Sequence, residues 1–121
     1  MADYPKRGDI YWIELDPTMG TEIQKKRPCL ILSNNSQNKK GTRVIAAPIT
    51  SKVKNVYPFE AKIIIKGRDC KVLLDQIRAL DKQRITSRID SIDADTMLQV
   101  EEALKITLAL KKIDCRGFES R

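Results

Sequence analysis

The sequence predicts a mainly β protein of the α+β kind, a small barrel-like sheet closed by one C-terminal helix. Three observations lead to this prediction. Short apolar runs, separated by Gly, Pro, Asn and Asp, fill most of the chain, as is typical of strands and turns. One long amphipathic segment follows them near the C-terminus. The length of 121 residues favours a single domain with a single core.

The strands are expected in a regular order along the chain. They cover residues 10–16, 28–34, 43–50, 59–65, 71–80 and 85–89. Polar loops over 18–26, 35–42 and 51–58 separate the first four, 67–69 is a turn, and 81–84 is a short or helical turn. Pro48 suggests an edge or a bulge near the end of the third strand, since proline lacks the N–H that a sheet requires.

The last element is predicted to be a helix. Asp93 is a suitable N-cap, and Asp95 lies where the helix dipole favours a negative charge. One stripe holds four apolar residues, and four more widen it: Met97, Val100, Leu104 and Leu108, then Leu98, Ala103, Ile106 and Leu110. We therefore expect one domain over 1–113, followed by a C-terminal tail over 114–121.

The charge balance favours a polyanionic partner. The formal net charge is +7, and the chain contains no histidine. The missing histidine excludes Ser-His-Asp and Cys-His chemistry. The three cysteines are widely spaced, so neither a metal site nor a cofactor is expected. No apolar run is long enough to span a membrane and the N-terminus lacks a signal-peptide core, which favours the cytoplasm.

A predicted hairpin brings two polar side chains together. Antiparallel partners have residue numbers with a constant sum, so pairing Asn34 with Arg43 also pairs Arg27 with Thr50. Directly opposed residues on one face have Cβ atoms about 4.5–5.5 Å apart. A guanidinium can clamp a phosphate through two hydrogen bonds, and a hydroxyl can donate to another phosphate oxygen. From the residues alone, a solvated arginine and a turn-forming threonine are the favoured interpretation, with catalysis the alternative.

Further polar residues are candidates for substrate contacts. Gln76 and Arg78 would share one face of the 71–80 strand, where Gln76 can read a base edge and Arg78 can touch phosphate; Asp75 points to the other face. Glu22, in the first long loop, can accept a proton or contact a base. The competing interpretation is a strand emerging into solvent and an ordinary loop charge.

The order of several motifs resembles the MazF/PemK toxin family over about residues 6–113. The matching segments are Gly8-Asp9-Ile10-Tyr11-Trp12, Leu15-Asp16-Pro17 with Gly20 and Glu22, Arg27-Pro28, Ala47-Pro48-Ile49-Thr50-Ser51, Tyr57-Pro58, Leu74-Asp75-Gln76-Ile77-Arg78 and Glu101-Glu102-Ala103-Leu104. The resemblance implies an SH3-like barrel. It also implies a toxin of a type II toxin–antitoxin pair that cuts single-stranded mRNA without a metal ion, leaving a 2′,3′-cyclic phosphate and a 5′-hydroxyl.

The same resemblance implies residue roles and partners. Arg27 matches the catalytic arginine, Thr50 the threonine that steadies the transition state, and Gln76 an RNA contact. The remaining substrate-binding candidates are Glu22, Asp75, Arg78, Thr21 and Ser51. The expected partners are single-stranded RNA, a second copy of the chain and an acidic MazE-like antitoxin.

Two other functions fit the same fold. A gyrase-inhibiting toxin would bind a gyrase subunit and leave RNA intact. A non-catalytic RNA-binding barrel would be expected to carry stacking aromatic residues, and the aromatic content is 5%. The RNA motif, the antitoxin and the role of the tail do not follow from residue types.

Overall fold

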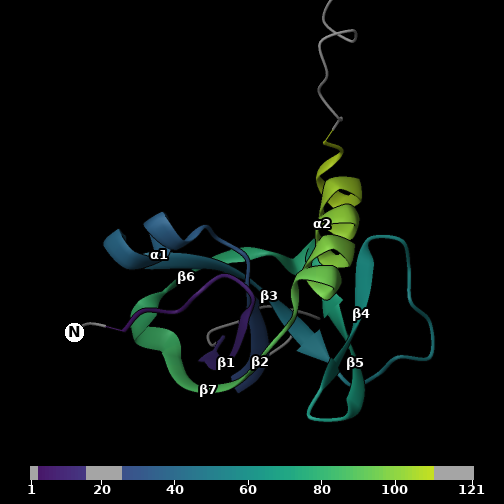
Figure 1. Ribbon diagram of the computed structural model, residues 1–121, viewed down its shortest axis with the longest axis horizontal. Coiled ribbons are helices and arrows are strands. Elements are labelled where there is room, and N and C mark those ends of the chain that lie inside the picture. Colours follow the sequence, from purple (N-terminus) through teal and green to yellow (C-terminus); the bar gives the residue numbers. More distant parts are fainter. Residues whose placement is uncertain (1–2, 16–25, 111–121) are drawn as a thin grey trace, which may run out of the picture.

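A curled antiparallel sheet with a C-terminal helix forms the architecture of the computed structural model, which describes residues 3–15 and 26–110 (Figure 1). Chain order is β1 (Asp9–Glu14), β2 (Lys26–Ile31), α1 (Asn35–Lys40), β3 (Arg43–Thr50), β4 (Glu60–Ile65), β5 (Arg68–Leu73), η1 (Leu74–Gln76), β6 (Arg78–Asp81), η2 (Lys82–Arg84), β7 (Ile85–Ser91) and α2 (Ala94–Leu108). The predicted mainly β fold with a C-terminal helix is confirmed.

The sheet curls because β3 changes partner along its length. The strand order is β4-β5-β3-β2-β1-β7, and β6 also pairs with β3. β3 pairs with β6 from Arg43 to Ala46 and with β5 from Ile49 to Thr50. Pro48 lies in the gap between these two pairings, where no ladder N–H is required. The expected edge is wrong, since β3 is an internal strand. The expected irregularity near the end of β3 is present as this interruption in pairing.

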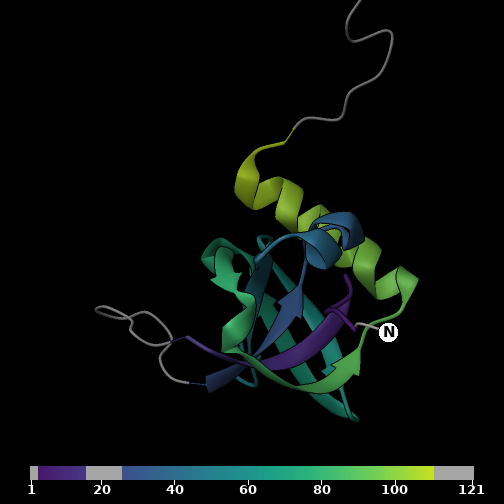
Figure 2. The same cartoon turned by 90° about the vertical axis from the view of Figure 1, so that its left-hand side faces the viewer.

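Helix α2 covers one face of the curled sheet (Figures 1 and 2). Asp93 is its N-cap, because its side chain accepts a hydrogen bond from the N–H of Thr96, as predicted. Val100 and Ala103 are buried in the main core. Four members of the wider apolar stripe are exposed in the single chain: Leu98, Ile106, Leu108 and Leu110.

Apolar residues pack on both faces of β3. The main core lies beneath α2 and includes Ala47 and Ile49 from β3. A smaller cluster on the opposite face includes Val44 and Ala46 from the same strand. Because side chains of one buried strand serve two apolar clusters, the register of β3 is tightly fixed.

Two expectations about local structure are wrong. Residues 35–42 contain the short helix α1, whose N-cap Asn34 accepts from the N–H of Gln37 at 2.8 Å. Residues 71–80 do not form one strand, because η1 interrupts them between β5 and β6. The turn expected at 67–69 lies at Lys66–Gly67, where both residues have positive φ angles, whereas 81–84 does contain the predicted helical turn.

Candidate active site

The register of β2 and β3 is the one that the sequence predicts. Cys29 pairs with Pro48, Leu30 with Ala47 and Ile31 with Ala46. The ladder ends at Cys29 and Pro48, so Arg27 and Thr50 lie two residues beyond it, where the same register would place them opposite each other. The expected pair of Asn34 with Arg43 is not part of the ladder, because Asn34 caps α1. Both side chains are half-buried and line one cavity. The pairing of β2 with β3, fixed by two apolar clusters, thus brings the cation and the hydroxyl to the same cavity.

The cavity that Arg27 and Thr50 share has a volume of about 310 Å³. Its lining comprises Arg27, Thr50, Lys52, Lys71, Leu73 and Gln76. Gln76 reaches the cavity from η1, so the structure brings this predicted contact beside the Arg27–Thr50 pair. Three cations and no carboxylate stand among these lining residues, an arrangement that favours an anionic ligand.

The hydroxyl of Thr50 is oriented by the turn that follows β3. Its Oγ1 accepts a hydrogen bond from the backbone N–H of Lys52 at 3.2 Å. A hydroxyl that accepts from one group still has its own proton to donate. Thr50 therefore serves the turn and remains able to donate to an oxygen in the cavity, so the two interpretations of this residue are compatible.

Lys71 is a cavity residue that the sequence analysis missed. It lies opposite Thr50 in β5, and its ammonium is 2.8 Å from Oε1 of Glu60. The same ammonium donates to the backbone oxygen of Asn55 at 2.5 Å. Both charged side chains are about nine-tenths buried, with 11% of Lys71 and 8% of Glu60 exposed. The available sequence signal was that Lys71 shares one face of β5 with Asp69 and Leu73, because alternate residues of a strand point to the same side.

This buried pair holds the loop between β3 and β4. Oε1 of Glu60 also accepts from the backbone N–H of Tyr57 at 3.0 Å. The ammonium of Lys71 lies 5.7 Å from the centre of the Tyr57 ring, which stacks on Phe59. The loop that follows Thr50 is thus anchored to the sheet beside the cavity.

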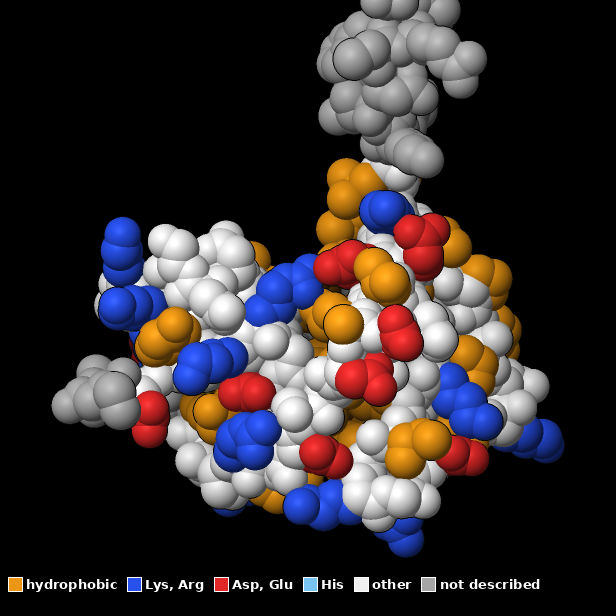
Figure 3. Space-filling model, viewed as in Figure 1, with side chains coloured by type: hydrophobic (Ala, Val, Ile, Leu, Met, Phe, Trp, Pro, Cys, Tyr) orange, Lys and Arg blue, Asp and Glu red, His pale blue; other side chains and the backbone are white. Residues whose placement is uncertain are grey.

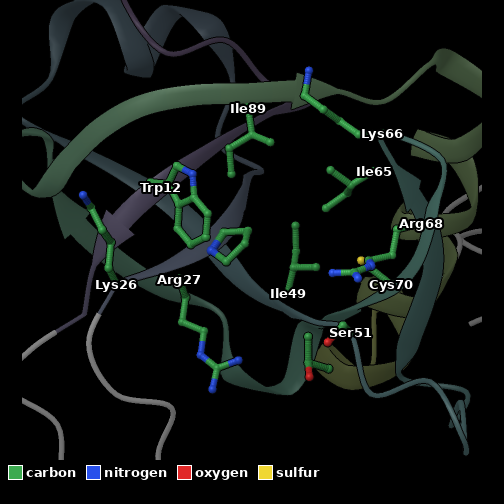
Figure 4. Close-up of a pocket in the computed structure, with 12 residues that line it drawn as sticks. Trp12, Lys26, Arg27, Ile49, Ser51, Ile65, Lys66, Arg68, Cys70 and Ile89 are labelled. Atoms are coloured by element: carbon green, nitrogen blue, oxygen red, sulfur yellow. The ribbon is translucent and has the colours of Figure 1, made fainter.

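A second and larger cavity lies on the other side of the Arg27–Thr50 pair. Its volume is about 810 Å³, and Ser51, another predicted contact, belongs to its lining (Figure 4). The other lining residues include Trp12, Lys26 and Pro28 on one side and Ile65, Lys66 and Arg68 on the other. Arg27 and Thr50 contribute to both cavities.

The remaining predicted contacts are not brought to these cavities. Asp75 is exposed in η1, and Arg78 pairs with Ala46 in β6; neither lines either cavity. Gln76 and Arg78 were expected to share one face of a strand. This expectation is wrong, because Gln76 belongs to η1 and the strand alternation is broken before Arg78. Thr21, Glu22 and the 114–121 tail lie outside the described residues.

Cys29, two residues after Arg27 in β2, has an unreactive thiol. It is fully buried, and burial raises the pKa of its thiol to about 12, against the lowering effects of Arg78 and Arg27. A neutral thiol at physiological pH is a poor nucleophile. Within residues 3–15 and 26–110, no group of three or more metal-ligating side chains is positioned to hold an ion.

Comparison with known proteins identifies the family. The family model described as PemK-like, MazF-like toxin of type II toxin–antitoxin system matches residues 6–108. The chain belongs to this family. The resemblance to the MazF/PemK family that its motifs indicate is therefore confirmed. Among residues 3–15 and 26–110, none of the helices could span a bilayer.

Relatives of known name and structure support the family assignment. Endoribonuclease EndoA of Bacillus subtilis is 40% identical over 110 residues, covering 87% of this chain and 95% of the relative. The crystal structure of MazF from Deinococcus radiodurans matches with a TM-score of 0.79 and 31% identity, covering 90% of this chain and all of that one. A MazE–MazF complex from the same organism matches at 27% identity and TM-score 0.72, covering 91% and 100% of the two chains.

Proposed function

We propose that this chain is the toxin of a type II toxin–antitoxin system and acts as a metal-independent endoribonuclease on single-stranded mRNA. The observation that carries the proposal is the guanidinium of Arg27 and the hydroxyl of Thr50 in one cation-lined cavity of a MazF-like fold. The named activity of relatives at 33–40% identity supports the enzyme class. Cutting mRNA would inhibit translation and growth.

The chemistry uses the nucleophile that RNA itself carries. The ribose 2′-oxygen forms a bond to phosphorus, and the bond from phosphorus to the 5′-oxygen breaks. The products are a 2′,3′-cyclic phosphate and a 5′-hydroxyl, with the 2′ proton lost to solvent and the 5′-oxygen protonated. DNA lacks this nucleophile and is expected to resist.

Arg27 and Thr50 supply electrostatic stabilisation in this scheme. Arg27 binds the non-bridging oxygens and neutralises charge that develops on the pentacoordinate phosphorus. The high pKa of a guanidinium makes it a poor base at neutral pH, so the electrostatic role is the stronger one. Thr50 donates its hydroxyl proton to a phosphate oxygen, and Gln76 contacts the RNA from the cavity wall.

The remaining predicted contacts are proposed with narrower roles. Ser51 extends the phosphate contacts, Thr21 and Glu22 contact bases from the first long loop, and Asp75 and Arg78 bind RNA beyond the cavity. Residues 1–113 form the toxin domain and 114–121 a tail of unassigned role, which agrees with the family match over 6–108.

The proposed partners follow from charge and exposed apolar surface. A net charge of +7 suits RNA and the acidic segment of a MazE-like antitoxin, as in the MazE–MazF complex of Deinococcus radiodurans. The exposed apolar side chains of α2 suit a homodimer contact; in Figure 3 apolar side chains are visible along this helix among acidic and basic ones. The cytoplasm, where mRNA is translated, is the proposed location.

One experiment tests the activity. The protein is incubated in EDTA with a long single-stranded RNA, and the cleavage ends are mapped. Cleavage at a short recurrent motif, with cyclic phosphate ends, is expected. Arg27→Ala and Thr50→Ala should abolish it while thermal unfolding stays cooperative. Intact RNA at micromolar wild-type protein contradicts the proposal, and capture of a gyrase subunit would then favour the gyrase-inhibiting toxin.

A further inference from the structure

The larger cavity has an apolar floor and an aromatic wall. Ile49, Ile65 and Cys70 are each less than a tenth exposed and form part of the floor together with Pro28 and Ile89. Trp12 is 38% exposed, so part of its indole is open to a ligand. A volume of about 810 Å³ lies within the range of small-molecule sites, about 300–1,000 Å³.

The rim of this cavity is strongly positive. Its four charged side chains are Lys26, Arg27, Lys66 and Arg68, and no carboxylate stands among the lining residues. None of the ion pairs found within residues 3–15 and 26–110 involves these four cations. Figure 4 shows Arg68 reaching toward Ile49, on the side of the opening opposite Trp12. The carboxylate of Asp90 accepts from the backbone N–H of Lys66 at 3.1 Å, so it offsets part of the charge at that end of the rim. An apolar floor under a rim of net positive charge calls for a ligand that is flat and apolar in one part and anionic in another.

We propose that this cavity is a nucleobase pocket of the RNA substrate, for a nucleotide next to the scissile phosphate. The inference deepens the proposed ribonuclease function and rests on it. The base stacks on the indole of Trp12, and its flanking phosphate is held by Arg68 and Lys66. Stacking on an aromatic side chain combined with cation–phosphate contacts is the common mode of single-strand binding.

The position of the pocket explains why its occupant would be a neighbour of the cut. Arg27 and Thr50 form walls of both cavities, so the two spaces meet at this pair. A chain whose phosphate lies in the smaller cavity has its adjoining nucleotide within reach of the larger one. The residues around Trp12 thereby act in the choice of sequence, while Arg27 and Thr50 act on the bond.

The test exploits the fact that Trp12 is the only tryptophan of the chain. A short single-stranded RNA pool with 2′-O-methyl groups at every ribose is titrated into the full chain, because these groups block the nucleophile. We expect quenching of Trp12 fluorescence that saturates together with the polarisation of dye-labelled RNA. Inorganic polyphosphate, an anion without bases, should compete for the rim without quenching Trp12.

Matched variants separate the pocket from general charge. Arg68→Ala should weaken RNA binding about tenfold, as expected for a lost charge-assisted hydrogen bond. Arg43→Ala removes the same charge from the exposed far end of β3 and should change binding by less than about twofold. Trp12→Leu should lower cleavage about tenfold or more, and Trp12→Phe should recover most of it through its ring.

The outcomes also distinguish this inference from the proposed function. Cleavage of RNA without any Trp12 quenching would refute the nucleobase pocket and leave the proposed ribonuclease function standing. An Arg68→Ala effect no larger than that of Arg43→Ala would do the same. Quenching by polyphosphate equal to that by RNA overturns the base contact. Quenching by an acidic peptide but not by RNA assigns the cavity to a protein partner instead. Failure of the wild type to bind or cut RNA removes the proposed function itself.

Discussion

The Lys71–Glu60 pair yields a prediction whose size follows from burial. Lys71→Met removes the ammonium but keeps a side chain of similar length, and it leaves the carboxylate of Glu60 nearly buried without its cation. Removing one member of a buried ion pair costs about 3–5 kcal/mol, because the remaining charge stays desolvated. We expect the free energy of unfolding to fall by about that amount.

A double variant tests whether the cause is the charge itself. Lys71→Met with Glu60→Gln replaces both charges, and the amide introduced at position 60 keeps an oxygen for the N–H of Tyr57, which Glu60 accepts at 3.0 Å. Replacement of both partners is close to neutral, so most of the lost stability should return. Urea unfolding followed by the fluorescence of Trp12 measures each variant.

An exposed lysine on the neighbouring strand is the control. Lys62 is opposite Lys71 in the ladder, and its contact with Asp69 at 3.6 Å leaves both side chains more than half exposed. Lys62→Met should therefore change stability by less than about 1 kcal/mol. Equal effects of Lys71→Met and Lys62→Met, or a double variant as unstable as Lys71→Met alone, would contradict a role for the buried charge.

Three further predictions concern other parts of the fold. Asn38 is fully buried and bonds Ser33, whose Oγ accepts from the N–H of Ile45, so Asn38→Ala should cost about 1–3 kcal/mol in urea unfolding, and no loss would contradict this. Hydrogen bonds from the Thr96 backbone and side chain lower the pKa of Asp93 in the folded chain. The contribution of Asp93 to stability is therefore present above about pH 4 and is lost as the pH falls through the lowered folded pKa. Asp93→Asn should reduce the fall of the thermal unfolding midpoint with decreasing pH, and an unchanged fall argues against this role. Burial raises the pKa of Cys29 to about 12, so iodoacetamide at neutral pH should spare Cys29 in the folded chain and modify it in urea, as peptide mass mapping can verify.

The sequence predicted the part of the site that depends on strand pairing. Two apolar strands of known spacing allow few registers, and the observed pairing of Cys29 with Pro48 is the one that brings Arg27 and Thr50 to a single cavity. Asp93 was equally predictable, because N-capping is a local property of one side chain and the N–H groups that follow it.

What sequence reasoning missed depends on distant contacts. The break at η1 was not predicted, since Leu73 and Leu74 continue an apolar run and the polar residues Asp75 and Gln76 also fit a strand that emerges into solvent. Helix α1 is only six residues long and is tied down by buried Asn38 rather than by an apolar stripe. The cavity role of Lys71 requires Glu60 from another strand, which a single strand pattern does not reveal.

The most direct test of the proposed mechanism uses the ribose at the cut site. Once a cleaved motif is mapped, an RNA oligonucleotide is made with a single 2′-deoxy nucleotide immediately 5′ of the scissile phosphate. We expect this substrate to bind like its all-ribose parent and to remain uncut at that bond, with or without EDTA. Cleavage at the deoxy position would show that the nucleophile comes from elsewhere and would contradict the role assigned to Arg27 and Thr50.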